Sequence, residues 1–268
     1  MESVGVDIFK KCCLTFWHAP ADAFSRAIEA IVWQRQEVKS PVLDIGCGDG
    51  GVSKFLFKGK KKIDVGLDIN KESVRLAKES GFYKQVRLGD ATRMPFKSSR
   101  FKTVISNSTF EHIENDRLAV KEVARVLKKG GSLMLTVPTK RLKKQLVKYL
   151  KKDKLIKAFD KRLEHWHYRS LAEWRQIMKK NGLEIIKHEY YFPDRAVRVW
   201  LKLFRLMTFK PYKRELWSYL KDPRFEKLLP KRLIAYGFYY YLRGYFRGMF
   251  DADGNLLFIK ARKLKSKR

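Results

Sequence analysis

The sequence predicts an α/β fold whose mostly parallel, doubly wound sheet has seven strands. Between residues 41 and 138, short apolar runs alternate with amphipathic stretches, and glycine, aspartate or proline follows most runs. Parallel strands are joined by crossover helices, so this alternation favours a parallel sheet covered by helices on both faces. Two more strand-like runs, near 183–192 and 255–263, bring the expected strands to seven.

The elements follow in order along the chain. The N-terminal segment 7–37 has helical spacing of apolar residues and a break at Pro20. The first five strands are expected at 41–45, 62–68, 85–88, 103–106 and 132–137, with helices at 52–57, 71–80 and 115–128. The last of these helices is expected to stop at Gly130-Gly131, because glycine commonly ends a helix.

Beyond Pro138 the chain becomes strongly basic. Residues 141–162 can form one amphipathic helix with lysines around an apolar side. Ser170 and Glu173 have the spacing of a capping box, which predicts a helix that ends near Asn181. Residues 194–250 are rich in aromatic and basic side chains.

Four segments are therefore expected. They are N-terminal helices covering the cofactor site (1–38), a cofactor-binding core (39–192), a helical aromatic and basic cap inserted late in the chain (193–253), and a last strand with a basic tail (254–268).

The strongest local pattern is the sequence VLDIGCGDG at residues 42–50. Gly46, Gly48 and Gly50 permit a tight turn from a strand into a helix and allow the backbone to approach a ligand closely. Their G-x-G-x-G spacing differs from the G-x-G-x-x-G of dinucleotide folds, where a pyrophosphate lies over the helix. Asp44, just before the glycines, suits a cationic amino-acid ligand better than a phosphate.

Two more carboxylates follow the next strands. Asp68 ends the second strand, where an acid can accept both ribose hydroxyls, and Asp90 follows the third, where it can accept the adenine amino group. Each alone is more often a turn or capping residue. Together they fall at the carboxyl ends of strands, where open α/β sheets bind ligands.

At this point the sequence resembles the class I S-adenosylmethionine-dependent methyltransferases, with a Rossmann-like fold. The resemblance rests on VLDIGCGDG, GLDIN, GDATRMPF, VISNSTFEHI and EVARVLKKGGSLMLTVP, within about residues 40–138. It is greatest to the subgroup acting on small molecules and on lipid or glycan intermediates. One departure is Lys102, where that subgroup usually has aspartate.

The resemblance implies the cofactor contacts residue by residue. The loop with Asp44, Gly46, Cys47, Gly48 and Gly50 would hold the methionine part of S-adenosylmethionine. The other implied cofactor-binding residues are Asp68 at the ribose with Ile69 beside it, Asp90 and Ala91 at the adenine, and Asn107 near the reacting methyl group.

Four side chains are candidate catalytic bases: Glu111, His112, His165 and His167. Methyl transfer to a hydroxyl needs a base, although alignment of the reactants supplies most of the catalysis. Glu111 could equally favour a helix dipole, and the histidines could equally anchor a loop. Paired histidines can also bind metal, but no third ligand is evident, so no metal is expected.

The net charge of the chain indicates what kind of molecule it binds. A net charge of +32 favours a polyanion, such as an anionic membrane or nucleic acid, although it can also serve only solubility. Basic helices with aromatic faces suit a membrane interface, and the alternative is a hydrophobic cap over the substrate. We therefore expect a small-molecule acceptor, an anionic lipid or a lipid-linked glycan intermediate. RNA or tRNA is the alternative, because arginine and aromatic side chains can bind phosphates and bases, and a non-catalytic regulatory module is a further one.

The remaining observations concern location. Three cysteines without ligand spacing predict a reduced intracellular setting, and the N-terminus lacks the features of a signal peptide. No run of apolar residues is long enough to span a membrane. A cytoplasmic protein, in peripheral contact with the inner face of the membrane, is expected; the oligomeric state stays open.

Overall fold

The computed structural model describes residues 2–57, 63–211, 213–246 and 254–264. The chain divides into two compact units. One combines the N-terminal 35 residues with residues 191–254, and the other combines residues 36–190 with residues 255–268. Each unit is described by itself.

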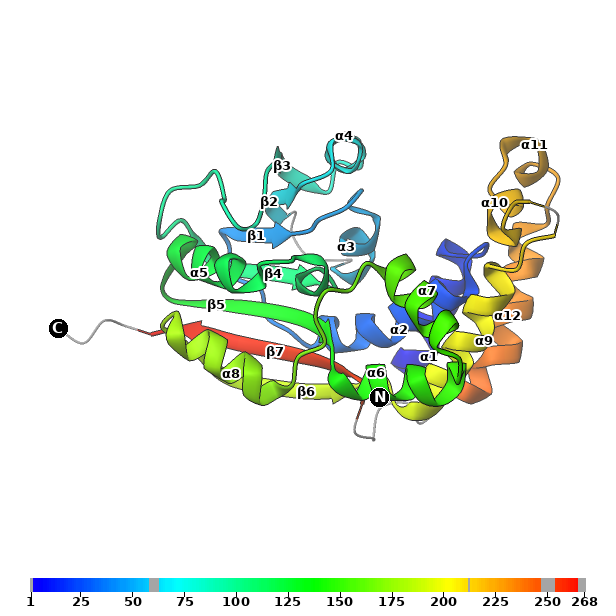
Figure 1. Cartoon of the computed structure of the whole chain (residues 1–268). Coiled ribbons are helices and arrows are strands. Elements are labelled where there is room, and N and C mark those ends of the chain that lie inside the picture. The colour runs from blue at the N-terminus through cyan, green and yellow to red at the C-terminus, as the bar shows by residue number, and fades with distance from the viewer. Residues whose placement is uncertain (1, 58–62, 212, 247–253, 265–268) are drawn as a thin grey trace. The chain divides into compact units, whose positions relative to one another are not determined.

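The second unit is built on a seven-stranded sheet in the order β3-β2-β1-β4-β5-β7-β6 (Figure 1). Neighbouring strands from β3 to β5 pair in parallel, whereas β7 runs antiparallel to β5. The predicted Rossmann-like, mostly parallel seven-stranded sheet is thereby confirmed. The strands are β1 (Val42–Ile45), β2 (Ile63–Asp68), β3 (Tyr83–Leu88), β4 (Phe101–Asn107), β5 (Leu127–Pro138), β6 (Leu183–Tyr191) and β7 (Leu256–Lys263).

Helices connect these strands, and side-chain caps fix where several of them begin. The Asn70 side chain accepts from the amide of Ser73 at the start of one helix, and Ser170 forms the expected capping box with Glu173. The helices are α3 (Gly51–Leu56), α4 (Lys71–Glu79), the 3-10 turn η1 (Phe110–His112), α5 (Asp116–Val126), α6 (Lys140–Leu150), α7 (Asp153–Leu163) and α8 (Leu171–Lys180).

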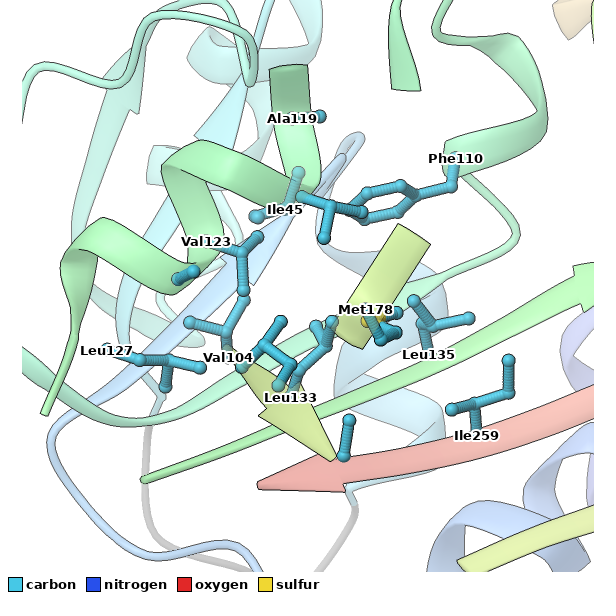
Figure 2. Packing of buried hydrophobic residues seen from close by; sticks show 14 of the residues in the cluster. Ile45, Val104, Phe110, Ala119, Val123, Leu127, Leu133, Leu135, Met178 and Ile259 are labelled. Carbon is cyan, nitrogen blue, oxygen red and sulfur yellow. The ribbon is translucent and has the colours of Figure 1, made fainter. Parts of the chain in front are cut away.

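The core of this unit lies between strands and helices. In Figure 2, Val123 of α5 lies close to Val104 of β4, and Leu133 and Leu135 of β5 extend the same cluster towards Ile259 of β7. These side chains are buried, so the hydrophobic effect holds α5 on the sheet. The carboxyl ends of β1, β2 and β4 are thereby fixed relative to one another.

Two sequence expectations about boundaries are wrong. The helix predicted to reach residue 128 ends at Val126, and β5 already begins at Leu127, which is fully buried and pairs with Phe101 in the register of β4. The single helix predicted over 141–162 is two helices. Lys151 adopts a left-handed conformation with φ of +58°, which ends α6 before α7 starts.

The first unit is a helical assembly made of α1 (Glu2–Thr15), α2 (Pro20–Gln34), α9 (Asp194–Met207), α10 (Leu216–Leu220), α11 (Pro223–Glu226) and α12 (Lys231–Phe246). Phe9 of α1 stacks on Phe246 of α12 with ring centroids 4.6 Å apart, and Phe24 of α2 meets Phe246 edge to face. Aromatic packing therefore joins helices from the two ends of this unit.

Other side chains of α12 are exposed rather than packed inside the unit. Leu233, Tyr240, Tyr241 and Tyr245 are exposed, and the Arg243 guanidinium lies 4.8 Å from the Tyr240 ring centroid. One part of α12 thus packs internally while another presents aromatic rings to solvent. Residues 247–253, at the end of the predicted cap, and residues 265–268 of the basic tail lie outside the described residues. Within the described chain, no helix has the length and apolar character to cross a membrane.

The buried core gives a stability test. We expect Leu135→Ala to lower the free energy of unfolding by about 3 kcal/mol, because a buried leucine leaves a cavity when truncated. The matched Leu118→Ala change on α5 removes a side chain that is 44% exposed and should cost less than about 1 kcal/mol. Urea unfolding of both variants measures the difference, and equal losses would contradict this core assignment.

Candidate functional site

A cavity of about 590 Å³ opens at the carboxyl ends of the parallel strands. Its volume is within the range that small-molecule sites occupy. The chain leaves β1 towards β2 on one side, and β4 lies on the other, so the cavity is at the switch point of the sheet. It is lined by Ile45 and Gly46 after β1, Leu67–Ile69 at β2, Gly89–Thr92 after β3, and Thr109 and His112–Asn115 after β4.

The loop after β1 is shaped by glycines with left-handed backbone angles. Gly46 has φ of +71°, and a Cβ added there would lie 2.3 Å from the Thr109 side chain. No other residue can take this position without displacing Thr109. The absence of a side chain at Gly46 therefore lets Thr109 pack closely against the loop where both residues line the cavity.

Asp68 ties this loop to β2. One carboxylate oxygen accepts from the Gly48 amide at 2.8 Å, and the other accepts from the Asn70 amide at 2.9 Å. A carboxylate has about four acceptor positions, so each oxygen can still accept a hydroxyl from a ligand. Asp68 lines the cavity and is positioned to bind a ribose-like diol.

Asp44 lies beneath the loop rather than on the cavity lining. Its buried carboxylate accepts from the Ser53 hydroxyl and the Tyr83 hydroxyl, each at 2.7 Å. Burial raises the pKa of Asp44 to about 6; these hydrogen bonds oppose the rise and the nearby Asp68 charge adds to it. Its direct contact with a ligand, as the resemblance implies, stays a prediction.

The loop is a negative region in a very basic chain. Burial raises the pKa of the Cys47 thiol, and the carboxylates of Asp44, Asp68 and Asp49 raise it further. A negative potential here favours a cationic ligand group, such as an ammonium or a sulfonium, and disfavours a pyrophosphate. The electrostatics therefore agree with the spacing of the glycines.

The other end of the cavity combines a carboxylate with apolar side chains. Asp90 lines it and accepts from the Thr92 amide at 2.7 Å. The Ile69 side chain is 71% exposed, unusual for isoleucine, and lines the cavity together with Ala91 and Ile113. An apolar surface beside an acceptor suits a flat aromatic ring that carries an amino group.

The remaining predicted cofactor residues lie outside the described cavity lining. Cys47, Gly48 and Gly50 belong to the loop, and Asn107 ends β4 with its side-chain oxygen accepting from the Thr136 hydroxyl at 2.9 Å. In addition, Thr109, Glu114 and Asn115 line the cavity and were missed by sequence reasoning. Their position after β4 was the available signal, since β4 borders the switch point.

The candidate bases gather from two distant segments. The Trp166 amide donates to the Glu111 carbonyl at 2.8 Å, which joins the turn η1 to the segment before α8. His112 lines the cavity, and its ring centroid is 5.1 Å from that of His165. Burial and the neighbouring His112 lower the pKa of His165 to about 4, so its imidazole is neutral at neutral pH.

His167 has a different environment. Its Nε2 lies 2.8 Å from the Glu114 carbonyl, which can only accept, so Nε2 carries the proton. Its Nδ1 lies 3.4 Å from the guanidinium of Arg169, which forms an ion pair with the buried Asp116. Both ring nitrogens have partners, and these contacts fit an anchoring role better than that of a base.

A family model described as a methyltransferase domain matches residues 43–135, which contain β2, β3 and β4, most of β1 and β5, and all the residues that line this cavity. The chain carries a class I S-adenosylmethionine-dependent methyltransferase domain. The glycine loop, Asp68 and Asp90 of this methyltransferase domain lie within the matched region, which accords with the resemblance seen in the sequence.

Known proteins agree on the domain and differ in their acceptors. The chain is 29% identical to a probable tocopherol O-methyltransferase of Oryza sativa, over 63% of this chain and 42% of that one. It is 30% identical to a probable tRNA methyltransferase 9B of Bos taurus, over 49% and 28%. The chain spans about half the length, or less, of these curated relatives.

A solved structure shows the same fold. It is an S-adenosylmethionine-dependent methyltransferase of Thermotoga maritima, described as a possible histamine N-methyltransferase. The TM-score is 0.60, with 19% identity and coverage of 97% of this chain and 99% of that one. The methyltransferase fold is thus shared at low sequence identity.

Asp68 provides a direct test of the cofactor site. We expect Asp68→Asn to weaken S-adenosylmethionine binding by about 10- to 100-fold, because hydrogen bonds to a charged acceptor contribute more than those to a neutral one. Asp64→Asn is the control: it lies at the other end of β2 and bonds the Val42 amide. Calorimetry measures both, and equal affinities for the two variants would exclude the role assigned to Asp68.

Asp44 predicts a pH dependence of stability. Its folded pKa of about 6 exceeds the ordinary value of 3.8, so the folded state holds the extra proton and loses stability as pH rises from about 4 to 6. The free energy of unfolding of Asp44→Asn, relative to that of wild type, should therefore rise by roughly 2 kcal/mol between pH 4 and pH 7. Urea unfolding without ligand across this range tests it; a pH-independent difference would show that Asp44 is not perturbed.

Proposed function

We propose that this protein transfers a methyl group from S-adenosylmethionine to a small-molecule acceptor. The observation that carries the proposal is the cavity at the switch point, which combines the negatively charged glycine loop with Asp68 and Asp90. A sulfonium cofactor bears positive charge at its amino-acid end and a diol and an adenine ring beyond. The residues present match each of these parts.

The chain's own residues would mainly bind and orient. When bound, the cofactor supplies an electrophilic methyl group on a sulfonium. Asp68 would accept from the ribose, while Ile69 and Asp90 would hold the ring. Such alignment lowers the barrier by fixing the reactants in an attack geometry. For a hydroxyl acceptor, His112 is the candidate base that lines the cavity.

We further propose that the acceptor is an anionic lipid or a lipid-linked glycan intermediate, reached at a membrane surface. Support comes from α12, where Tyr240, Tyr241 and Tyr245 are exposed and the Arg243 guanidinium lies over the Tyr240 ring, and from the net charge of +32. Aromatic rings prefer the membrane interface, and basic side chains are attracted to anionic lipid headgroups.

Labelled methyl transfer tests the function. The full chain is incubated with methyl-labelled S-adenosylmethionine and fractionated cell extract, and label should enter the lipid or small-molecule fraction. Asp68→Asn should reduce this incorporation at limiting cofactor. Failure of label to enter any fraction, with cofactor binding intact, would instead indicate a non-catalytic module.

The membrane proposal has its own measurement. The protein should sediment with vesicles containing anionic lipid, more weakly at high salt, and hardly at all with neutral vesicles. The double change Tyr241→Ser and Tyr245→Ser should reduce sedimentation several-fold. Ile186→Ser, which alters a 40% exposed side chain on β6 of the other unit, is the control. Equal sedimentation of the two variants would exclude α12 as the contact.

A tRNA acceptor is the second candidate. It is favoured by the names of several relatives, among them a tRNA methyltransferase of Arabidopsis thaliana, and by the positive charge. In the labelling experiment it would be recognised by label in the RNA fraction that is sensitive to ribonuclease. That outcome would replace the lipid proposal without altering the cofactor assignment.

A further inference from the structure

Three potential metal ligands converge at the edge of the cavity. Glu111, His112 and His165 each offer one ligand atom, and these atoms all lie within 4.8 Å of one another. Glu111 and His112 belong to η1, whereas His165 comes from the segment before α8. The Trp166–Glu111 backbone hydrogen bond holds the two segments together, so the cluster is built into the fold.

The hydrogen bonds of His112 decide which of its nitrogens can bind an ion. Nδ1 lies 3.2 Å from the Glu164 carbonyl oxygen. A carbonyl can only accept, so Nδ1 must carry the proton, and the lone pair of the neutral ring is on Nε2. A backbone carbonyl on the far nitrogen is a common way of orienting a metal-binding histidine.

His165 is oriented in the same sense by a chain of polar groups. Its Nδ1 lies 3.0 Å from the Tyr168 hydroxyl, which donates to the Asp160 carboxylate at 3.2 Å. Because the hydroxyl proton is directed to Asp160, the hydroxyl oxygen accepts from Nδ1 of His165. The lone pair of His165 is again on Nε2. The Asp160 carboxylate also forms an ion pair with Lys143, and this pairing offsets the positive charge of the lysine near the cluster.

We propose that Glu111, His112 and His165 bind a divalent transition-metal ion of the zinc class. Two imidazole nitrogens and one carboxylate are a ligand set that zinc takes in catalytic sites, with a further position open. Tetrahedral ligands at zinc bond lengths are about 3.4 Å apart, so a small closure around the ion is required. Glu111 is buried and His112 is exposed, so the side chain that would close on the ion is that of His112.

The open position would face the cavity that His112 lines. An ion there could hold an anionic oxygen of the acceptor, such as a phosphate, carboxylate or phenolate. This role rests on the proposed methyl transfer, but binding of the ion does not. With the ion bound, His112 is a ligand and no longer the base, and the ion takes over the activation of the acceptor oxygen. Sequence reasoning expected no metal because the pair of histidines at 165 and 167 lacked a third ligand. In the structure, the histidine close to His165 is His112 rather than His167, and Glu111 is the third potential ligand.

The test is a metal titration of the full chain, prepared without a histidine tag and stripped with a chelator. Calorimetry with Zn²⁺ should give one ion per chain, and Co²⁺ should give visible absorption bands typical of a protein site. His112→Ala and His165→Ala should each weaken zinc binding at least 10-fold, whereas the control His188→Ala on β6 should not. Tyr168→Phe should weaken it about 10-fold, because it removes the acceptor that orients His165.

Two further measurements distinguish loss of the metal site from loss of the fold. Zinc should raise the melting temperature of wild type but not of His165→Ala, and the melting temperature of each variant without zinc shows whether it is folded. Absence of stoichiometric zinc binding by a wild-type protein that binds S-adenosylmethionine would overturn the metal site and leave the proposed function intact. Equal zinc affinity in wild type, His112→Ala and His165→Ala would also overturn it.

Discussion

The carboxylate of Asp68 is the contact on which the site depends. It accepts from amides of two loops, from Gly48 after β1 and from Asn70 after β2. Two strand ends are thereby held at a fixed separation, and the left-handed glycines of the loop are fixed with them. Because the carboxylate also lines the cavity, the same group that organises the loop is available to a ligand.

The glycine loop is negatively charged, although the chain as a whole is strongly positive. The chain carries +32, yet Asp44, Asp49 and Asp68 make the glycine loop negative, and their charges add to the rise that burial causes in the pKa of the Cys47 thiol. A cationic cofactor is attracted to the loop, while the excess of lysine and arginine elsewhere attracts an anion. This separation explains how one chain could bind a positively charged donor and an anionic acceptor.

The fold was largely predictable from the sequence, because the apolar runs and glycine turns between residues 41 and 138 are local signals. The breaks that were missed depend on tertiary packing. Leu127 belongs to a strand, where it pairs with Phe101 of β4, which is distant in sequence. Lys151 ends α6 in a left-handed conformation at a position where the sequence has no glycine to signal a helix end. Backbone conformation at such positions is decided by neighbours that are distant in sequence.

The residues of the site that follow the strand ends were predictable from the sequence, whereas the directions of buried side chains were not. Asp68, Ile69, Asp90 and Ala91 line the cavity because strand ends in a parallel sheet converge. The direction of the Asp44 side chain, towards Ser53 and Tyr83, could not be inferred from a linear pattern. Nor could the approach of Glu111 to His165, since it depends on one backbone hydrogen bond between distant segments.

Hydrogen–deuterium exchange of backbone amides, with and without S-adenosylhomocysteine, tests the central assignment most directly. The account predicts slower exchange on ligand binding in peptides that cover residues 45–50, 68–70, 89–92 and 109–115, because these surround the cavity. Peptides from α12 should exchange at unchanged rates. Protection confined to other segments, or none at a ligand concentration that saturates binding, would contradict the placement of the cofactor at the switch point of the sheet.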